Sequence, residues 1–105
     1  MVIDREANED VGLLKVLAEP MRWKIVELLA REELCVCHLV DELDAPQSLI
    51  SHHLRALREA DLVDTDRHRY WTYYRLRPDA LQALARRIDD LASAAAVGLS
   101  RRPCC

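Results

Sequence analysis

The order of secondary structure follows from residues 33–60, which read ELCVCHLVDELDAPQSLISHHLRALREA. Apolar side chains recur every three or four positions through residues 34–43 and again through residues 46–60, and this period is typical of amphipathic helices. Pro46 separates the two patterns, because proline is accepted in the first turn of a helix and breaks the interior of one. Two short helices joined by so tight a turn predict a helix-turn-helix.

The flanking residues extend this motif. The helical period also predicts helices at about residues 8–17 and 20–30. Beyond the second helix of the motif the period changes to two, and β-branched and aromatic residues become frequent. Residues 62–65 and 70–76 therefore predict the strands of a β-hairpin, with residues 66–69 as a basic turn that lacks the usual glycine.

A last helix is predicted to begin at Pro78 and to end at about Val97, before Gly98. The predicted fold class is therefore mainly α: a winged helix-turn-helix with four helices, a β-hairpin wing and a C-terminal helix. We expect this domain to occupy residues 1–99 and a flexible tail that carries cysteines to occupy residues 100–105.

Composition excludes several other classes of protein. The 105 residues are 50 % hydrophobic, which is enough for one modest core and too apolar for a disordered chain. Two glycines and four prolines are too few for the many turns of a β-sandwich. No apolar run approaches the ~20 residues of a membrane helix, and the first ten residues are acidic, unlike a secretory signal. We therefore expect a cytoplasmic protein with no membrane partner.

Charge is unevenly distributed along the chain. The net charge is -3, but residues 1–45 carry eleven acids and five bases, whereas residues 46–77 carry four acids and six arginines. The basic middle coincides with the second helix of the motif and the hairpin. Thirteen of the fifteen cations are arginine, which suits phosphate and guanine edges, although a GC-rich genome also produces such a bias.

The polar face of the helix in residues 46–60 is the candidate DNA-reading surface. At about 100° per residue, Ile50, Leu54 and Leu57 share one face and polar side chains occupy the opposite one. In helix-turn-helix proteins the amino-terminal part of this helix enters the major groove. Together with two arginines of the hairpin tip, the expected DNA contacts are Gln47, Ser48, Ser51, His52, Arg55, Arg67 and Arg69.

A polar face is also what any core helix presents to water, so this face alone does not indicate DNA binding. The short preceding helix and the basic hairpin favour DNA. His53 lies about 60° from Ile50 and is expected to be a half-buried packing residue. The aromatic residues of the hairpin are expected to pack in the core, because base-stacking platforms accompany sheet-based folds that bind single strands. The expected partner is double-stranded DNA.

The four cysteines form two close pairs, Cys35 with Cys37 and Cys104 with Cys105. Such pairs are poor at bridging distant segments, so we expect reduced thiols and a site for a soft metal. On an ideal helix, side chains two positions apart point about 200° apart. Cys35 and Cys37 are therefore expected to hold one ion only if the first turn of their helix unwinds. Unwinding would move the helix that follows, residues 46–60, which carries the candidate DNA contacts. The alternative is that both are small buried apolar residues.

The chain resembles the ArsR/SmtB family of bacterial metal-responsive transcriptional repressors over about residues 11–96. The resemblance rests on LAEPMR at residues 17–22, ELCVCHL at 33–39, QSLISHHLRALR at 47–58 and RYWTYYRL at 69–76. It implies a homodimer that pairs through its first and last helices and leaves its operator when metal binds. The sequence departs from the family at His38, where arsenic sensors usually have aspartate, and at Val40, where some members have a third cysteine.

The number of thiolates separates the candidate inducers. Trivalent arsenic or antimony takes three thiolates, an expectation that the resemblance supports, so Cys104 or Cys105 is needed beside Cys35 and Cys37. All four thiolates would suit cadmium, lead or zinc instead. Alternatively, the tail cysteines are non-specific thiols. The last helix offers no histidine pair near Asp89, which argues against the zinc site of some relatives.

Three classes of function remain open. The first is a repressor of a metalloid-resistance operon that arsenite or antimonite releases from DNA, with a sensor of a divalent soft metal as its variant. The second is a thiol redox switch on the same scaffold. The third is an enzyme, which we do not expect, because no glycine-rich loop or carboxylate pair indicates a catalytic cavity.

Overall fold

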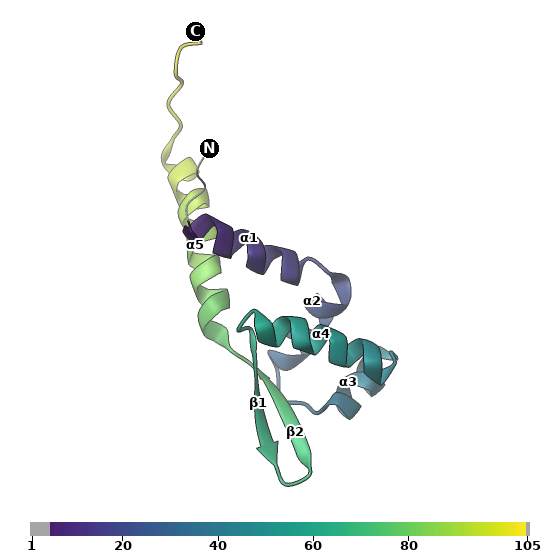
Figure 1. Ribbon diagram of the computed structural model, residues 1–105. Helices are drawn as coiled ribbons and strands as arrows, with labels where there is room; N and C mark the ends of the chain where they lie inside the picture. Colours follow the sequence, from purple (N-terminus) through teal and green to yellow (C-terminus); the bar gives the residue numbers. More distant parts are fainter. Residues whose placement is uncertain (1–4, 105) are drawn as a thin grey trace.

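The computed structural model describes residues 5–104 and has the predicted mainly α, winged helix-turn-helix fold (Figure 1). Within the described residues there are five helices and a two-stranded hairpin, whose turn projects away from the helices. Their bounds are α1 (Arg5–Leu17), α2 (Pro20–Leu29), α3 (Val36–Leu43), α4 (Gln47–Glu59), β1 (Val63–His68), β2 (Trp71–Leu76) and α5 (Pro78–Val97). The division into a domain of residues 1–99 and a tail stays a prediction.

The core lies where α2, α3 and α4 pack together. The apolar stripe predicted for α4 is buried, because Ile50, Leu54 and Leu57 are at most 1 % exposed. They pack with Leu39 of α3 and Ile25 of α2. Full burial of side chains this large contributes about 1.5–3 kcal/mol each to folding. This core fixes the angle between α3 and α4.

The turn between α3 and α4 consists of residues 44–46. Asp44 ends α3 in the left-handed conformation, with φ 49° and ψ 49°, and Pro46 stands as the N-cap of α4. Asp44 accepts the positive φ because aspartate tolerates this conformation better than most side chains. The predicted three-residue turn of the helix-turn-helix is therefore confirmed.

The start of α3 corrects the sequence prediction. A helix was expected from Leu34, but α3 begins at Val36, and Cys35 is its extended N-cap with φ -82° and ψ 166°. The cause is an isolated bridge to the wing, in which the backbone N–H of Leu34 donates to the Tyr74 carbonyl at 3.1 Å and Tyr74 donates back at 2.8 Å. These bonds commit Leu34 to β geometry and delay the helix by two residues.

The wing is longer than predicted. β1 and β2 pair from Val63 with Leu76 to His68 with Trp71, so the turn contains only Arg69 and Tyr70. Residues 66–68 were expected in the turn and lie in β1 instead. A two-residue turn suits a tightly twisted hairpin, and Arg69 supplies the positive φ, at 59°, that glycine usually supplies there.

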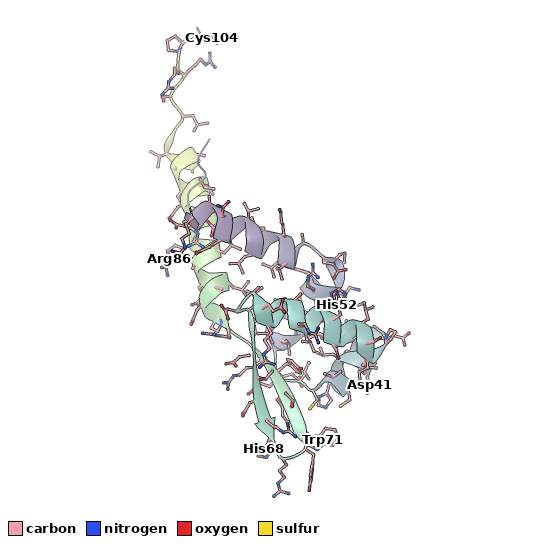
Figure 2. The ribbon with its side chains drawn as sticks, viewed as in Figure 1. Asp41, His52, His68, Trp71, Arg86 and Cys104 are labelled. Carbon is pink, nitrogen blue, oxygen red and sulfur yellow. The ribbon has the colours of Figure 1, made fainter. Side chains whose placement is uncertain are left out.

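The aromatic residues of the wing divide differently from the expectation. Tyr74 packs against the core, as predicted. Tyr70 and Trp71 do not, because they are 90 % and 57 % exposed. Both lie at the free end of the hairpin, beyond the reach of the helical core, as Figure 2 shows for Trp71.

The helices α1 and α5 lie against each other at one side of the domain (Figure 1). Arg87 of α5 joins them, since its Nε donates to both carboxylate oxygens of Asp10 at 2.6 and 2.7 Å. Several apolar side chains of the predicted helical stripes remain exposed on these two helices, among them Val11, Leu14, Ile88 and Leu91. Within residues 5–104, no helix combines the length and apolar character needed to cross a membrane.

Candidate functional site

Two of the four cysteines lie together at the start of α3. One ligand atom from each of Cys35, Cys37 and His38 falls within 4.8 Å of the other two, and we call these three side chains the thiol cluster. Cys35 is buried, whereas Cys37 and His38 are exposed. The prediction that the two thiols diverge was wrong, because Cys35 lies outside the helix with extended backbone. No unwinding is needed to bring the two sulfur atoms together.

His38 holds the start of α3 in place. Its Nδ1 atom accepts a hydrogen bond from the backbone N–H of Cys35 at 3.0 Å. This is the return bond of a capping box, in which the third helical side chain satisfies the N-cap N–H. An accepting Nδ1 leaves the proton of the neutral ring on Nε2. The sequence analysis did not predict this role for His38, although a polar side chain three positions after an N-cap is a signal for this bond.

We expect His38→Ala to loosen the thiol cluster and His38→Gln to preserve it. Loss of the bond to the Cys35 N–H should lower the free energy of unfolding by about 1 kcal/mol. It should also speed the reaction of Cys35 with a thiol reagent, because burial of this residue depends on the start of α3. Glutamine offers an acceptor at the same position. Thermal unfolding and thiol-labelling rates measure both effects, and identical behaviour of the Ala and Gln variants would contradict this role.

The electrostatics of the cluster favour a protonated Cys35. Burial raises the pKa of the Cys35 thiol, and the nearby Cys37 raises it further. A hydrogen bond with Tyr73 of β2 opposes these effects. Cys35 is therefore a thiol at neutral pH, and a soft metal that binds its sulfur must displace the proton.

A cleft of about 590 Å³ connects the thiol cluster with the reading helix. Cys35 and Cys37 lie at its α3 side, Gln47 and Ser51 come from the first turns of α4, and Trp71 comes from β2. The candidate metal ligands and two of the predicted DNA contacts thus border one space. Sequence reasoning did not predict this cleft, because it depends on the packing of three elements.

All seven predicted DNA contacts are exposed, and they come from α4 and the wing. In Figure 2, His52 marks α4, and His68 and Trp71 mark the free end of the wing. His53 is buried rather than half-buried, at 7 % exposure. Its Nδ1 accepts a long hydrogen bond of 3.4 Å from Arg22 of α2, and burial lowers its pKa. His53 therefore packs α4 against α2, as its position on the helical wheel predicted.

The tail thiol is remote from the thiol cluster in the described conformation. Figure 2 shows Cys104 beyond the far end of α5, away from α3 and its label Asp41. Cys104 is exposed, and it does not belong to the group of ligand atoms around Cys35. The other predicted tail ligand, Cys105, lies outside the described residues.

Comparison with known proteins points to one family. The family model described as the bacterial regulatory proteins of the arsR family matches residues 19–65. The chain is 42 % identical over 81 residues to the arsenical resistance operon repressor of Escherichia coli (strain K12), a match that covers 76 % of this chain and 69 % of the relative.

The chain is also similar to solved structures. A possible transcriptional regulator for arsenical resistance is 37 % identical, with a TM-score of 0.67 over 83 % of this chain and 96 % of that one. An ArsR-like transcriptional regulator from Rhodococcus sp. RHA1 has a TM-score of 0.77 over 85 % of this chain and 84 % of that one. Its identity is 24 %, so this second likeness concerns the fold alone.

Proposed function

The chain belongs to the ArsR family of bacterial regulatory proteins, and from this premise we propose that it is a repressor that arsenite or antimonite releases from operator DNA. It is a regulator of transcription with a DNA-binding helix-turn-helix and is not an enzyme. One observation supports this proposal above the others: Cys35 and Cys37 border the same cleft as Gln47 and Ser51. A ligand held by the two sulfurs acts directly on the surface that reads DNA. Release then derepresses a metalloid-resistance operon in the cytoplasm.

The DNA surface combines two kinds of contact. The first turns of α4 present Gln47, Ser48 and Ser51, whose short polar side chains suit base edges in the major groove. The wing presents Arg67 and Arg69, whose charge suits the phosphate backbone. His52 and Arg55 complete the exposed face of α4 and contact either bases or phosphate.

A homodimer explains the apolar surface of α1 and α5. Val11 and Leu14 on α1 are about half exposed, and Ile88 and Leu91 on α5 are 50 % and 74 % exposed. Faces of this kind on two adjacent helices form a contact patch between copies of one chain. A twofold dimer then presents two reading helices to an imperfect inverted repeat.

The donor set fits trivalent arsenic if one tail thiol joins the cluster. Thiolate sulfur suits soft metals and metalloids, and the thiol cluster supplies two of the three that arsenic takes. The cluster lies beside β2, and only Arg77 separates β2 from α5. The 20 residues of α5 are about 30 Å long. Residues 98–105 span at most about 29 Å when extended, so a tail that turns back along its own α5 reaches the start of α5 at most and falls short of the cluster, which lies farther on beside β2.

We therefore assign the third thiolate, Cys104 or Cys105, to the tail of the partner subunit. If both tail thiols bind, the resulting four-sulfur set suits cadmium, lead or zinc, and the coordination number of the bound ion separates these inducers. Titration of the dimer with arsenite, followed by mass spectrometry and sulfur coordination by X-ray absorption, tests the donor set.

The decisive test of function is release from DNA. A fluorescent duplex selected from a random pool supplies an operator probe, and anisotropy reports its complex with the protein. Arsenite is expected to dissociate the complex, and peroxide is not, which separates metalloid sensing from a thiol redox switch. A complex that persists at saturating arsenite, or that forms better on single strands, overturns the proposal.

Replacement of Arg67 and Arg69 together by alanine should weaken binding to all duplex sequences about equally. Both arginines are exposed on the wing, where they are proposed to neutralise phosphates, so the slope of log affinity against log salt should also fall by about one for each phosphate no longer neutralised. Gln47→Ala should instead change which sequence is preferred. Replacement of Arg101 and Arg102 together by alanine removes the same charge from the exposed tail and serves as the control. An unchanged salt slope in the wing variant would exclude phosphate binding by the two arginines.

A further inference from the structure

The free end of the wing carries two large exposed aromatic side chains. Tyr70, in the two-residue turn, is 90 % exposed, and Trp71, the first residue of β2, is 57 % exposed. Figure 2 shows Trp71 near the free end of the hairpin, away from the core. Adjacent apolar side chains that the rest of the described chain leaves uncovered are typical of a contact with a partner.

The charge around this aromatic pair suits a polyanion. Residues 67–71 contain two arginines, Arg67 and Arg69, and no acidic residue. Both arginines are exposed, as are the two aromatic residues. A partner that accepts positive charge and flat apolar rings at one place matches the edge of a DNA duplex, where phosphates flank stacked bases.

The tip is also continuous with the proposed DNA surface. Trp71 and Thr72 line the wing side of the cleft of about 590 Å³, and Gln47 and Ser51 of α4 line it as well. The strands of the wing are six residues long and so extend about 20 Å. Adjacent major and minor grooves are centred about half a helical turn, or roughly 17 Å, apart. The wing is therefore long enough to reach the minor groove beside the major groove that α4 is proposed to enter.

We propose that Tyr70 inserts its ring into this minor groove as a wedge between two base pairs, and that Trp71 packs on a sugar at the groove wall. The inference rests on the proposed DNA surface and involves no inducer. A two-stranded ribbon with its side chains is too wide for an undistorted minor groove of about 6 Å, so only the turn enters. Arg67 and Arg69 then lie beside the phosphates that they are proposed to neutralise.

An aromatic wedge selects DNA by its deformability and not by hydrogen bonds. A side chain inserted from the minor groove partly unstacks one base step and bends the duplex toward the major groove. Pyrimidine–purine steps such as TA and CA unstack most readily. Each half of the operator should therefore contain such a step about five base pairs from those that Gln47 contacts.

Variants of the protein and of this step are tested together, by anisotropy of labelled duplexes without arsenite. The wild-type protein should bind a duplex with TA at the wing step about three- to tenfold more tightly than one with the stiff AA step. Tyr70→Ala should lose this preference and bind the TA duplex more weakly by the same factor, whereas Tyr70→Phe keeps the ring and both properties. Trp71→Ala should weaken both duplexes equally, because packing on a sugar does not depend on the step.

Emission of 2-aminopurine reports the unstacking directly. With this base at the wing step, emission should rise when the wild-type protein or Tyr70→Phe binds, and should not rise with Tyr70→Ala. Trp23→Ala is the matched control, because Trp23 of α2 is a 50 % exposed aromatic residue outside the proposed DNA surface, and it should behave as the wild type does. Thermal unfolding of Tyr70→Ala should match that of the wild type, since this side chain is almost fully exposed.

The outcomes separate the wedge from the rest of the DNA surface. If Tyr70→Ala keeps the wild-type affinity and the wild-type preference for TA, the wedge is overturned while recognition by α4 stands. If the wild-type protein binds no duplex, the proposed DNA surface fails and the wedge fails with it. Release by arsenite has no bearing on either result, because the inducer is absent from every measurement.

Discussion

Cys35→Ser and Cys37→Ser are each expected to keep the affinity for operator DNA and to lose most of the release by arsenite. Serine is among the preferred N-cap residues, so Cys35→Ser retains the start of α3. Cys37 is exposed, so its replacement removes little packing. A hydroxyl does not replace a thiolate as a ligand of arsenic. The coupling between inducer and DNA that is at stake is about 1–3 kcal/mol, or roughly 5- to 150-fold in DNA affinity.

Anisotropy of a labelled operator duplex measures both quantities, first without arsenite and then across an arsenite titration. Val36→Ala is the matched control, because it changes the residue between the two cysteines and keeps both sulfurs. The control should release DNA at the wild-type arsenite concentration. If either serine variant does so as well, the sensing site lies elsewhere.

The pre-formed cluster changes how coupling must arise. The sequence predicted that metal binding unwinds the first turn of α3, but the two thiols already meet at its N-cap. In the described state no conformational change is needed to bring the two thiols together. A bound ligand must therefore affect DNA binding through the residues that it contacts. Cys35 contacts the wing through Tyr73, and the cleft reaches Gln47 and Ser51 of α4. Both elements belong to the proposed DNA surface.

The fold was predictable because its signals are local. The stripe of Ile50, Leu54 and Leu57, the proline at the turn and the change of period after α4 each depend on neighbours in sequence, and the structure agrees with all three. The ends of the elements were less predictable. The bridge between Leu34 and Tyr74 joins residues 40 positions apart, and no local pattern shows that it replaces the first turn of a helix.

The candidate site was predictable in its residues and not in its geometry. Two cysteines at positions 35 and 37 suggested a soft-metal site, but the angle between them depends on where α3 begins. That start depends in turn on the bridge to β2 and on the cap from His38. Trp71 was expected in the core and is exposed for a related reason. Alternation along a strand shows which face a side chain is on, but it does not show how far along the strand the core extends.

Truncation after Pro103 is expected to raise the arsenite concentration for half-release by about tenfold or more, while dimerisation and DNA binding survive. The removed residues, Cys104 and Cys105, lie beyond the end of α5 at Val97, and the reading helix and wing are unchanged. Loss of one of three thiolates leaves arsenic without its third sulfur. Size-exclusion chromatography measures dimerisation. Anisotropy of the labelled operator duplex measures DNA affinity and the arsenite concentration for half-release. A truncated dimer that responds like the full-length protein would show that the tail has no role in sensing arsenite.

A heterodimer then tests which subunit supplies the tail. One subunit carries Cys35→Ser and Cys37→Ser with an intact tail, and the other carries both cluster cysteines and ends at Pro103. A site with three thiolates forms in this pair only if the intact tail crosses to the α3 of the other subunit. Because the eight extended residues of the tail do not reach past α5 to the cluster beside β2, we expect the heterodimer to recover one site and to release DNA at lower arsenite than the truncated homodimer. Equal insensitivity of the two dimers would instead place each tail thiol on its own chain.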